Sequence, residues 1–597
     1  MHVNPAVPPN ILIILSDDQG YGDFSCHGNP VVRTPNFDRL HDESVRLTDF
    51  HVAPMCTPTR GQLMTGLDAL HNGATHVFCG RTFLRRGIPT MADIFAANGY
   101  RTGLFGKWHL GDNHPFRPEE RGFQETLYFP SAAITSAPDY WNNDYFDDTY
   151  RHNGVLQQYQ GYCTDVFFDE AMKWMRRCQE EGRPFFTYLA TGADHTPYYV
   201  ADHYREPYRH LGIYLASFFG MVANYDENMG RMEEFLRQTG LRDNTIVIFM
   251  TDNGAVITVD LYNAGMREGK CSLYDGGHRV PCFIRWPGGR LREPGPIHQT
   301  TQVQDVLPTL IDLCGLTVQR ELHFDGVSLA GVLCDPKATL SDRMLVVQYG
   351  DVLTKYDATV LWNKWRLVCN AELYDLRQDP GQKRDVAAAN PEIVQKMRRH
   401  YERWWEDLGP QVMAYEPISV GSERENPVCL SQVDWSGTIL CYQMEVRGLW
   451  QQNPRFNLQS LNGPWRLLVE QPGEYEIALQ RWPREADAPL CGAAPEFVPT
   501  DKTFYEATQP KAEAPQGERW AWEAAAMQPA VALPIAKARC KIADFDQTVP
   551  VGPQDKAATF RLALPVGPAQ LQTWFYDAQG QALCGALYVY ITRAEDR

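Results

Sequence analysis

The chain has 597 residues, and at roughly 100 to 200 residues per domain this length predicts two or three structural units. Hydrophobic residues make up 44% and charged residues 22% of the chain, which is typical of a globular protein and excludes a disordered or fibrous one. The net charge of -17 argues against a general role on nucleic acid, which needs an excess of Lys and Arg. An anionic substrate would therefore have to meet a local positive pocket.

The sequence shows no targeting or membrane-spanning segment. Residues 1–9 lack a basic region followed by an apolar run, and no apolar run approaches the roughly 18 residues of a membrane span. We expect no membrane partner. Without a signal segment we expect a cytoplasmic protein. If a signal had been removed, the protein would be periplasmic or secreted. No feature predicts an oligomeric state.

Two short apolar runs, residues 10–15 and residues 245–251, end in side chains that carry oxygen ligands. The pair Asp17-Asp18 follows the first run and the pair Asp252-Asn253 follows the second. Such runs predict buried parallel strands, and ligands of open α/β sheets gather at the carboxyl ends of such strands. We therefore expect both pairs to face one site.

Helical and strand-like segments alternate between and around these two runs. Helical periodicity over residues 91–98, 164–179 and 218–239 alternates with strand candidates over residues 101–105 and 185–190. This alternation predicts an α/β fold.

The pattern changes toward the end of the chain. Residues 375–408 predict a loop followed by a helix, and from about residue 415 short alternating segments such as 463–470 and 474–480 are separated by Pro and Gly turns, with an Ala-rich stretch near Trp520. These segments predict a β-sandwich-like accessory domain. The predicted units are an α/β domain over 1–335, its C-terminal subdomain over 336–412 and the accessory domain over 413–597.

Fifteen cysteines without C-x-x-C pairs argue against a zinc knuckle, and their odd number excludes a full disulfide framework. One of them, Cys56, stands in an unusual context. It opens the run Cys56-Thr57-Pro58-Thr59-Arg60, which is followed by Gly61 and by Leu63-Met64-Thr65-Gly66.

This run and several other motifs resemble the sulfatase family of the alkaline phosphatase superfamily over roughly residues 10–410. In chain order the motifs are Asp17-Asp18, Cys56 to Arg60, Gly106-Lys107-Trp108-His109-Leu110-Gly111, His195, Asp252-Asn253-Gly254, and Lys270 before Gly276-Gly277. The resemblance implies a doubly wound mixed sheet flanked by helices. It also implies that a separate formylglycine-generating enzyme oxidises Cys56 to formylglycine.

The resemblance further implies catalytic roles for individual residues. In the family one hydroxyl of the hydrated aldehyde attacks sulfur, and the other later loses a proton to release sulfate. Arg60, one helical turn after Cys56, would hold the hydrate. Lys107 would contact hydrate and sulfate, and His109 would take the proton. Two further residues, His195 and Lys270, would grip the ester oxygen and protonate the leaving group.

The candidate metal ligands are Asp17, Asp18, Asp252 and Asn253, with the modified Cys56 completing the set. Hard oxygen donors favour calcium over zinc, and magnesium is the alternative for a smaller cavity. The expected cofactors are therefore Ca²⁺ or Mg²⁺ together with formylglycine.

Some residues depart from the family pattern or remain ambiguous. Asp194 and Glu268 stand where relatives often carry proline and a small residue, and both are interpreted as loop carboxylates that face solvent. His278 and the aromatic acidic segment 139–150 are candidates for substrate contact, although a segment of this composition is more often a packed lid.

Three functions remain open at this point. The first is hydrolysis of sulfate esters, of a sulfated carbohydrate or oligosaccharide or of a small aryl sulfate. The second is hydrolysis of phosphate or phosphonate esters by the same kind of centre. The third is a sulfated-glycan-binding protein without turnover, against which the full set of candidate catalytic residues argues.

Overall fold

The structure is a computed structural model that describes residues 8–318, 322–437, 443–448, 461–500 and 530–594. The Ala-rich stretch near Trp520 lies outside these residues. Among the helices of the described part, none is long and apolar enough to cross a membrane.

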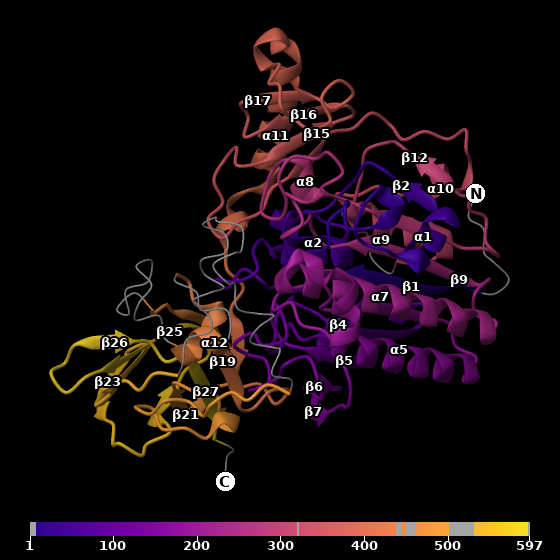
Figure 1. The fold of residues 1–597 in the computed structure, drawn as a ribbon. Coiled ribbons are helices and arrows are strands. Elements are labelled where there is room, and N and C mark those ends of the chain that lie inside the picture. Colours follow the sequence, from indigo (N-terminus) through magenta and orange to yellow (C-terminus); the bar gives the residue numbers. More distant parts are fainter. Residues whose placement is uncertain (1–7, 319–321, 438–442, 449–460, 501–529, 595–597) are drawn as a thin grey trace.

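A ten-stranded mixed sheet organises the first half of the chain (Figure 1). The central strands run parallel, whereas β11 runs antiparallel to β9 and to β2. In spatial order the strands are β12 (Gly295–Ile297), β2 (Val45–Leu47), β11 (Cys282–Arg285), β9 (Thr245–Thr251), β1 (Asn10–Ser16), β8 (Phe185–Ala190), β4 (Arg101–Lys107), β5 (Glu125–Phe129), β6 (Thr149–His152) and β7 (Val155–Gln158).

Helices cover both faces of this sheet because its central strands are apolar on both sides. In β1, Leu12 and Ile14 pack into one hydrophobic cluster, and Ile11 and Ile13 pack into another. The first cluster includes α1 (Pro35–Asp42), α5 (Cys163–Glu180) and α7 (Ile213–Gln238), and the second includes α2 (Cys56–Thr65), α4 (Met91–Ala97), α9 (Val306–Cys314) and α10 (Ala330–Cys334). The predicted doubly wound mixed sheet is confirmed.

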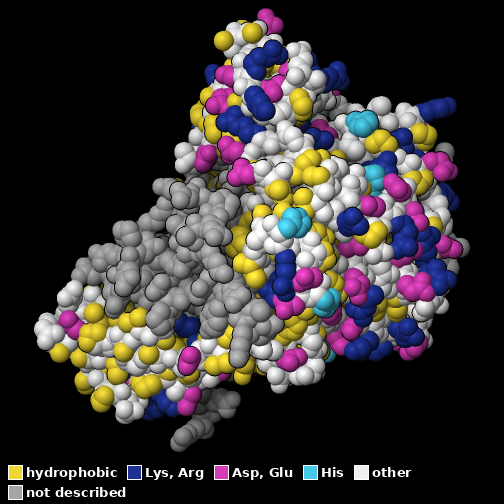
Figure 2. Space-filling view, viewed as in Figure 1, with side chains coloured by type: hydrophobic (Ala, Val, Ile, Leu, Met, Phe, Trp, Pro, Cys, Tyr) yellow, Lys and Arg dark blue, Asp and Glu magenta, His cyan; other side chains and the backbone are white. Residues whose placement is uncertain are grey.

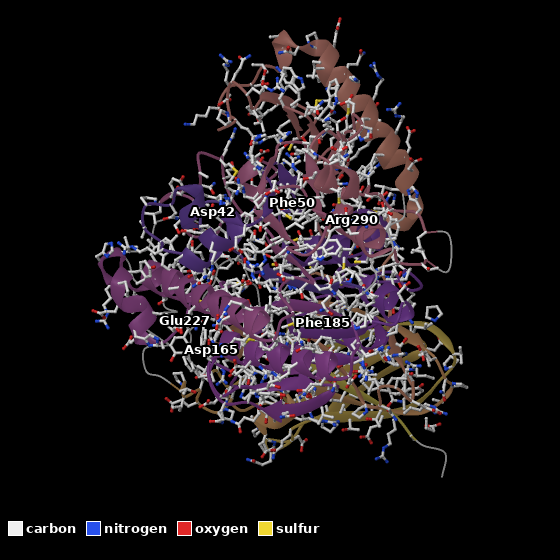
Figure 3. All side chains as sticks on the ribbon, turned by 90° about the vertical axis from the view of Figure 1, so that its right-hand side faces the viewer. Asp42, Phe50, Asp165, Phe185, Glu227 and Arg290 are labelled. Carbon is white, nitrogen blue, oxygen red and sulfur yellow. The ribbon has the colours of Figure 1, made fainter. Side chains whose placement is uncertain are left out.

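Polar contacts fix the two long helices of the first layer against each other. Asn224 and Asn228 of α7 donate hydrogen bonds of 2.9 and 2.7 Å to the carboxylate of Asp165 on α5. Figure 3 shows Asp165 beside α7, near Glu227, and Phe185 at the start of β8 inside the molecule.

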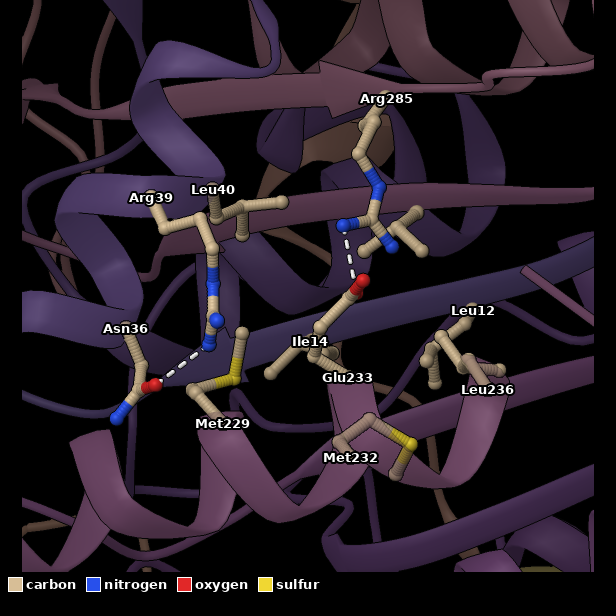
Figure 4. A pocket seen from close by; sticks show the side chains of 11 residues that line it. Leu12, Ile14, Asn36, Arg39, Leu40, Met229, Met232, Glu233, Leu236 and Arg285 are labelled. Atoms are coloured by element: carbon tan, nitrogen blue, oxygen red, sulfur yellow. Dashed lines mark hydrogen bonds and ion pairs between the residues drawn. The ribbon is translucent and has the colours of Figure 1, made fainter. Parts of the chain in front are cut away.

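A small cavity of about 20 Å³ lies between β1, α1 and α7 (Figure 4). Its polar rim is paired, because Glu233 and Arg285 form an ion pair of 2.6 Å and Arg39 donates to Asn36 at 2.7 Å. A space of this size holds about one water molecule. The cavity is therefore a packing defect in the core and too small for a substrate.

A smaller sheet follows the large one. It contains β14 (Leu345–Val347), β15 (Thr359–Trp362), β16 (Trp365–Val368) and β17 (Glu372–Asp375). Helix α11 (Pro391–Leu408) covers it, with Met397 and Tyr401 buried against Val360 and Leu367. Further short elements are α3 (Ala69–Asn72), α6 (Asp202–Arg205), α8 (Asp275–His278) and a sheet of β10 (Arg279–Val280), β3 (Phe50–His51) and β13 (Thr301–Gln302).

The C-terminal region is built from two sheets that share one hydrophobic core, as predicted for a sandwich-like unit. The core also takes in Phe83, Phe116 and Trp141 from loops of the α/β unit. The first sheet contains β18 (Ile418–Val420), β20 (Trp465–Val469), β25 (Gly567–Tyr576), β22 (Lys537–Ile542), β23 (Phe545–Pro550) and β26 (Ala582–Cys584). The second contains β19 (Val428–Ser431), β27 (Tyr588–Arg593), β21 (Gly473–Gln480) and β24 (Ala558–Leu564), and α12 (Gln443–Gly448) precedes β20. The domain boundaries given above stay a prediction.

Candidate active site

Four neighbouring strands, β9, β1, β8 and β4, deliver most of the predicted site residues to one edge of the large sheet. These strands run parallel, so their carboxyl ends lie together. Lys107 ends β4, and the pairs Asp17-Asp18 and Asp252-Asn253 follow β1 and β9. All of these side chains are buried.

Cys56 is the first residue of α2 and faces this edge. Met55 before it is extended, and the helix ends at Gly66, whose φ of 68° suits glycine. The Cys56 Sγ donates to Asp17 Oδ1 and to Asn253 Oδ1 at 3.4 Å each, and Lys270 Nζ approaches the sulfur at 3.5 Å. Burial, and then the Asp252 carboxylate, raise the pKa of this thiol well above its usual value.

Arg60 lies one turn along α2, and its guanidinium is directed at Asp252. Its Nε and Nη2 donate to Asp252 Oδ2 at 3.1 and 2.8 Å, and Nη1 donates to the carbonyl of Lys107 at 3.0 Å. Both side chains of the ion pair are fully buried. Arg60 therefore ties the helix to the ends of β9 and β4, and its contact with a hydrate stays a prediction.

The side chains of Lys107 and His109 make separate contacts, although only one residue lies between them. Lys107 Nζ donates to Asp17 Oδ2 at 2.6 Å, inside the centre. His109 has a φ of 57°, and its Nε2 donates to the carbonyl of Val77 at 3.1 Å. Burial, followed by the positive charges of Lys107 and Arg60, lowers the pKa of His109 well below its usual value. The Val77 contact is made by the main chain, so no sequence motif announced it.

His195 and Lys270 both contact Asp18. His195 Nε2 lies 3.6 Å from Asp18 Oδ2, while its Nδ1 donates to the carbonyl of Thr196 at 2.7 Å. Burial lowers the pKa of His195 to about 3, despite the opposing charge of Asp18. Lys270 donates to Asp18 Oδ1, and burial is outweighed by the Asp18 carboxylate, so the pKa of Lys270 is raised well above its usual value.

Asp17, Asp18 and Cys56 of the predicted metal ligands lie in one buried group, which also includes His195 and does not include Asp252. Ligand atoms of Asp17, Asp18, Cys56 and His195 lie within 4.8 Å of one another. Asn253 Nδ2 donates to Asp18 Oδ1 at 3.0 Å, which joins both strand ends. Burial and the neighbouring Asp17 carboxylate raise the pKa of Asp252 to about 6, a penalty that a cation among these oxygens would offset.

The interpretation of Asp194 as a carboxylate that faces solvent is wrong, whereas Glu268 is exposed as expected. Asp194 is fully buried, because its main-chain N–H donates to the carbonyl of Asp17 at 2.7 Å and holds its loop against β1. Neither of its carboxylate oxygens has a hydrogen-bond partner among the described residues. Burial, followed by Asp23 and Asp17, raises its pKa well above the usual value.

The two candidates for substrate contact outside the main motifs are occupied by internal contacts. His278 is fully buried and its Nδ1 lies 2.9 Å from Nδ1 of His51. These two residues and Asp275 form a second group of possible metal ligands, and the Arg366 guanidinium lies 3.2 Å from His51 Nε2 and 2.9 Å from Asp275 Oδ1.

The aromatic segment 139–150 is largely buried and packs against the C-terminal region. Gln443 Nε2 donates to the carbonyl of Asp139 at 2.9 Å, and the Arg447 guanidinium lies 4.1 Å from the centre of the Trp141 ring. Within the segment, the Tyr145 hydroxyl also donates to the carbonyl of His195 at 3.3 Å. The segment is therefore packed, and Tyr145 joins it to the loop that carries His195.

Comparisons with known proteins show the family to which the chain is related. The sulfatase family model matches residues 9–316, just over half of the 597 residues. The human N-acetylgalactosamine-6-sulfatase is 30% identical over 371 residues, which are 58% of this chain and 69% of that protein. The protein of the same name from Canis lupus familiaris is 30% identical over 71% of this chain and 88% of its own length. Human arylsulfatase A is 29% identical over 66% of this chain and 87% of its length.

Solved structures show the same architecture. Ps i-CgsB in complex with k-i-k-neocarrahexaose has a TM-score of 0.62 and 27% identity, covering 68% of this chain and 95% of that one. A putative sulfatase from Bacteroides fragilis, at 20% identity and a TM-score of 0.57, covers 70% of this chain and 99% of that one and supports the fold alone.

A doubly wound sheet with carboxylates, lysines and a cysteine converging at its carboxyl edge defines a hydrolase of the alkaline phosphatase superfamily. Within it, the chain belongs to the sulfatase family and is a sulfuric ester hydrolase.

Proposed function

We propose that the protein hydrolyses sulfate esters of a carbohydrate, using a formylglycine made from Cys56 and a calcium ion bound beside it. The observation that carries this proposal is the position of Cys56 Sγ, 3.4 to 3.5 Å from Asp17, Asn253 and Lys270. The carbohydrate substrate is supported by relatives named for N-acetylgalactosamine 6-sulfate chemistry and by a similar structure that holds a neocarrahexaose.

Asp17, Asp18, Asp252 and Asn253 would hold the cation, with an oxygen of the modified Cys56 completing the set. When bound, a divalent cation lowers the pKa of an adjacent hydroxyl and stabilises negative charge on the sulfuryl oxygens. Formylglycine supplies, as its hydrate, an oxygen nucleophile in place of a thiol. The all-oxygen donor set favours calcium, with magnesium as the alternative.

His109 is arranged to accept a proton. The Val77 carbonyl can only accept a hydrogen bond, so His109 Nε2 carries the proton of the neutral ring and Nδ1 presents its lone pair. No described residue is a hydrogen-bond partner of Nδ1. Because its lowered pKa keeps the ring neutral, His109 can act as a general base.

Lys270 and His195 take different roles on the leaving-group side. His195 uses Nδ1–H on the Thr196 carbonyl and is neutral, so its Nε2 has no proton to give. Lys270 keeps its proton because of Asp18, and its Nζ lies 3.5 Å from the sulfur that marks the nucleophile. We therefore assign protonation of the leaving oxygen to Lys270, and orientation of the ester to His195.

Lys107 supplies positive charge from the other side of the centre. Its ammonium lies 2.6 Å from Asp17 and is fully buried, where a fixed charge acts strongly on an anionic sulfate. Since Arg60 holds Asp252 and the Lys107 carbonyl, the cation ligands and Lys107 keep a fixed relative position.

The test is sulfate release by protein coexpressed with a formylglycine-generating enzyme, together with the mass of the peptide that contains Cys56. Paired sulfate and phosphate esters of 4-nitrophenol and a set of sulfated sugars serve as substrates. We expect formylglycine in the peptide and no sulfate release by Cys56→Ala. Cys369→Ala is the matched control, because Cys369 is exposed and lies outside the centre.

Three outcomes would contradict the proposal. Preference for the phosphate ester would favour the phosphate or phosphonate hydrolase. Modified protein that binds sulfated sugars but releases no sulfate would favour a binding protein. Sulfate release by Cys56→Ala at the wild-type rate would exclude the nucleophile itself.

A further inference from the structure

An open groove of about 870 Å³ lies between the large sheet and the smaller β14–β17 sheet. We call it the hairpin groove, because the turn between β15 and β16 forms one of its walls. It is lined by cationic and aromatic side chains together with polar ones. The lining residues on which the argument depends are Arg279, His298, Trp362, Lys364, Trp365 and Arg377.

The turn presents two indole rings side by side. Trp362 and Trp365 are directly paired across β15 and β16, so their side chains project from the same face of the hairpin. This face packs against α11, where Lys396 Nζ lies 3.8 Å from the centre of the Trp362 ring, so the indoles meet the groove with their edges. Both are half-buried. Trp362 is held by a 2.8 Å hydrogen bond from its Nε1 to Asp342, and the ammonium of Lys364 lies 4.5 Å from the centre of the Trp365 ring.

A buried arginine makes this wall rigid. Arg366 donates to Asp49 at 2.7 Å and to Asp275 at 2.9 Å, which belong to the α/β unit, and also to the Asn363 carbonyl at 2.8 Å in the turn. Its side chain is fully buried. The hairpin is thus fixed to the large domain, and a ligand in the groove would lose little affinity to ordering of the protein.

The charges in the groove leave an excess of positive charge. Arg366 is paired with two carboxylates, Asp49 at 2.7 Å and Asp275 at 2.9 Å, and Lys364 is paired with Asp375 at 2.6 Å. With Arg279 and Arg377 the four cations therefore exceed the three carboxylates by one charge. No ion pair of Arg279 or Arg377 occurs within the described part of the chain, although Arg279 donates from Nε and Nη2 to the Thr48 carbonyl at 3.0 and 2.7 Å. Figure 2 shows Lys and Arg side chains interspersed with Asp and Glu over the top of the molecule, where Figure 1 places β15 to β17 and α11. In a protein with a net charge of -17, a local excess of positive charge with the exposed Arg377 beside the groove favours an anionic ligand.

The groove opens at the same sheet edge as the catalytic centre. β2 and β12 run parallel to β9, so Thr48 and His298, which follow them and line the groove, lie at their carboxyl ends. β9, which carries Asp252, is separated from β2 and β12 by two and three strand positions. At about 4.8 Å per strand the two sites are roughly 10 to 14 Å apart along the sheet.

We propose that the hairpin groove binds a second sulfated sugar unit of the oligosaccharide whose ester is hydrolysed at Cys56. Arg377 and Arg279 would donate to sulfate oxygens, and the indole edges of Trp362 and Trp365 would contact the sugar ring. This inference rests on the proposed carbohydrate sulfatase function. It adds that the substrate is an oligosaccharide with more than one sulfate group.

The kinetic test compares a long substrate with a short one. For release of sulfate from a κ-carrageenan or chondroitin sulfate hexasaccharide, we expect Arg377→Glu to raise KM about tenfold with kcat unchanged, as loss of one charge-assisted contact predicts. Hydrolysis of 4-nitrophenyl sulfate should not change. Arg399→Ala is the matched control, because Arg399 is exposed on α11 and does not line the groove.

Direct binding separates this inference from the proposed function. The full-length Cys56→Ala protein is titrated calorimetrically with the same two hexasaccharides and with uncharged maltohexaose, with and without Arg377→Glu or Trp365→Ala. We expect sulfated hexasaccharides to bind, maltohexaose not to bind, and both substitutions to weaken binding about tenfold. Because Arg377 is exposed, Arg377→Glu tests the groove even if Trp365→Ala fails to fold.

The possible failures are distinguishable. If Arg377→Glu alters neither KM for the hexasaccharides nor their binding, or if no sulfated hexasaccharide binds, the groove proposal is overturned. If binding depends on Arg377 but no sulfate is released from any substrate, the groove proposal stands and the proposed catalytic function fails.

Discussion

The catalytic centre and the hairpin groove both place cationic side chains at the carboxyl edge of one sheet, but in opposite dielectric environments. Arg60 and Lys107 are fully buried, and each is matched by a carboxylate within 2.8 Å. Arg377 is exposed and has no ion pair among the described residues. A buried charge has to be paired, whereas a surface charge can stay open because water and salt screen it. The two sites should therefore respond differently to mutation and to salt.

The largest effect is expected when the buried ion pair between Arg60 and Asp252 is broken. Arg60→Leu should lower the free energy of unfolding by about 3 to 5 kcal/mol, because Asp252 is left as an unpaired buried carboxylate. Urea denaturation followed by fluorescence measures this loss. Arg101→Leu is the control, since its pair with Glu181 is exposed and should contribute at most about 1 kcal/mol. Equal losses for the two variants would contradict the contrast between interior and surface.

Replacement of Lys107, the second of the two buried cationic side chains, should lower the rate of catalysis. Lys107→Met should lower kcat/KM by about 10² to 10³, because a fixed charge beside the reacting sulfate is lost from a site that excludes water. The loss should be the same for 4-nitrophenyl sulfate and for a sulfated hexasaccharide. A loss confined to the hexasaccharide would place Lys107 in substrate binding and would remove its distinction from Arg377.

Cation binding should stabilise the centre and leave the groove unaffected. At about 100 times its Kd, calcium should raise the free energy of unfolding by about 2.7 kcal/mol, seen as a higher melting temperature after removal of metal with EDTA. The Asp252→Asn variant, which keeps the shape but lowers the ligand charge, should show a smaller shift. Stabilisation by zinc in preference to calcium would contradict the assignment of the oxygen donors.

The part of the fold that carries the site followed from local patterns. Residues 11–15 and 246–250 are apolar at every position, as is typical of short strands covered on both faces, and each run is a strand here, in β1 and β9. The polar pairs that follow them meet around Cys56, as the shared carboxyl edge requires. The catalytic roles that the family resemblance assigns to these residues stay predictions until they are tested.

Other features depend on contacts between distant segments and left no local pattern. Burial of Asp194 results from its main-chain bond to Asp17, 177 positions away in the chain. The hairpin groove needs the turn after β15 to meet residues that follow β2 and β12, and the sequence Trp-Asn-Lys-Trp alone does not show which cations it would meet. Such contacts are set by topology, and composition cannot predict them.

In the C-terminal region, too, the sequence predicted the local structure but not the contacts between distant segments. Its sheet content was predicted from alternating segments, but its core also contains Phe83 and Trp141 of the α/β unit. In Figure 2 its visible face carries more hydrophobic and neutral side chains than the charged surface of the α/β unit. Because the two units share a core, the C-terminal region supports the loops around the centre and is more than a flexible appendage.

The smallest expected effect is also the one that separates the two sites most directly. Raising NaCl from about 0.05 to 0.5 M shortens the Debye length from roughly 14 to 4 Å, which screens exposed charges such as Arg377 far more than buried ones. Binding of a sulfated hexasaccharide to the Cys56→Ala protein should weaken about three- to tenfold, and this salt dependence should diminish in Arg377→Glu. Turnover of 4-nitrophenyl sulfate should change much less, because Lys107 and Arg60 act from the interior. An equal salt dependence of both measurements would mean that affinity for the hexasaccharide is set at the catalytic centre.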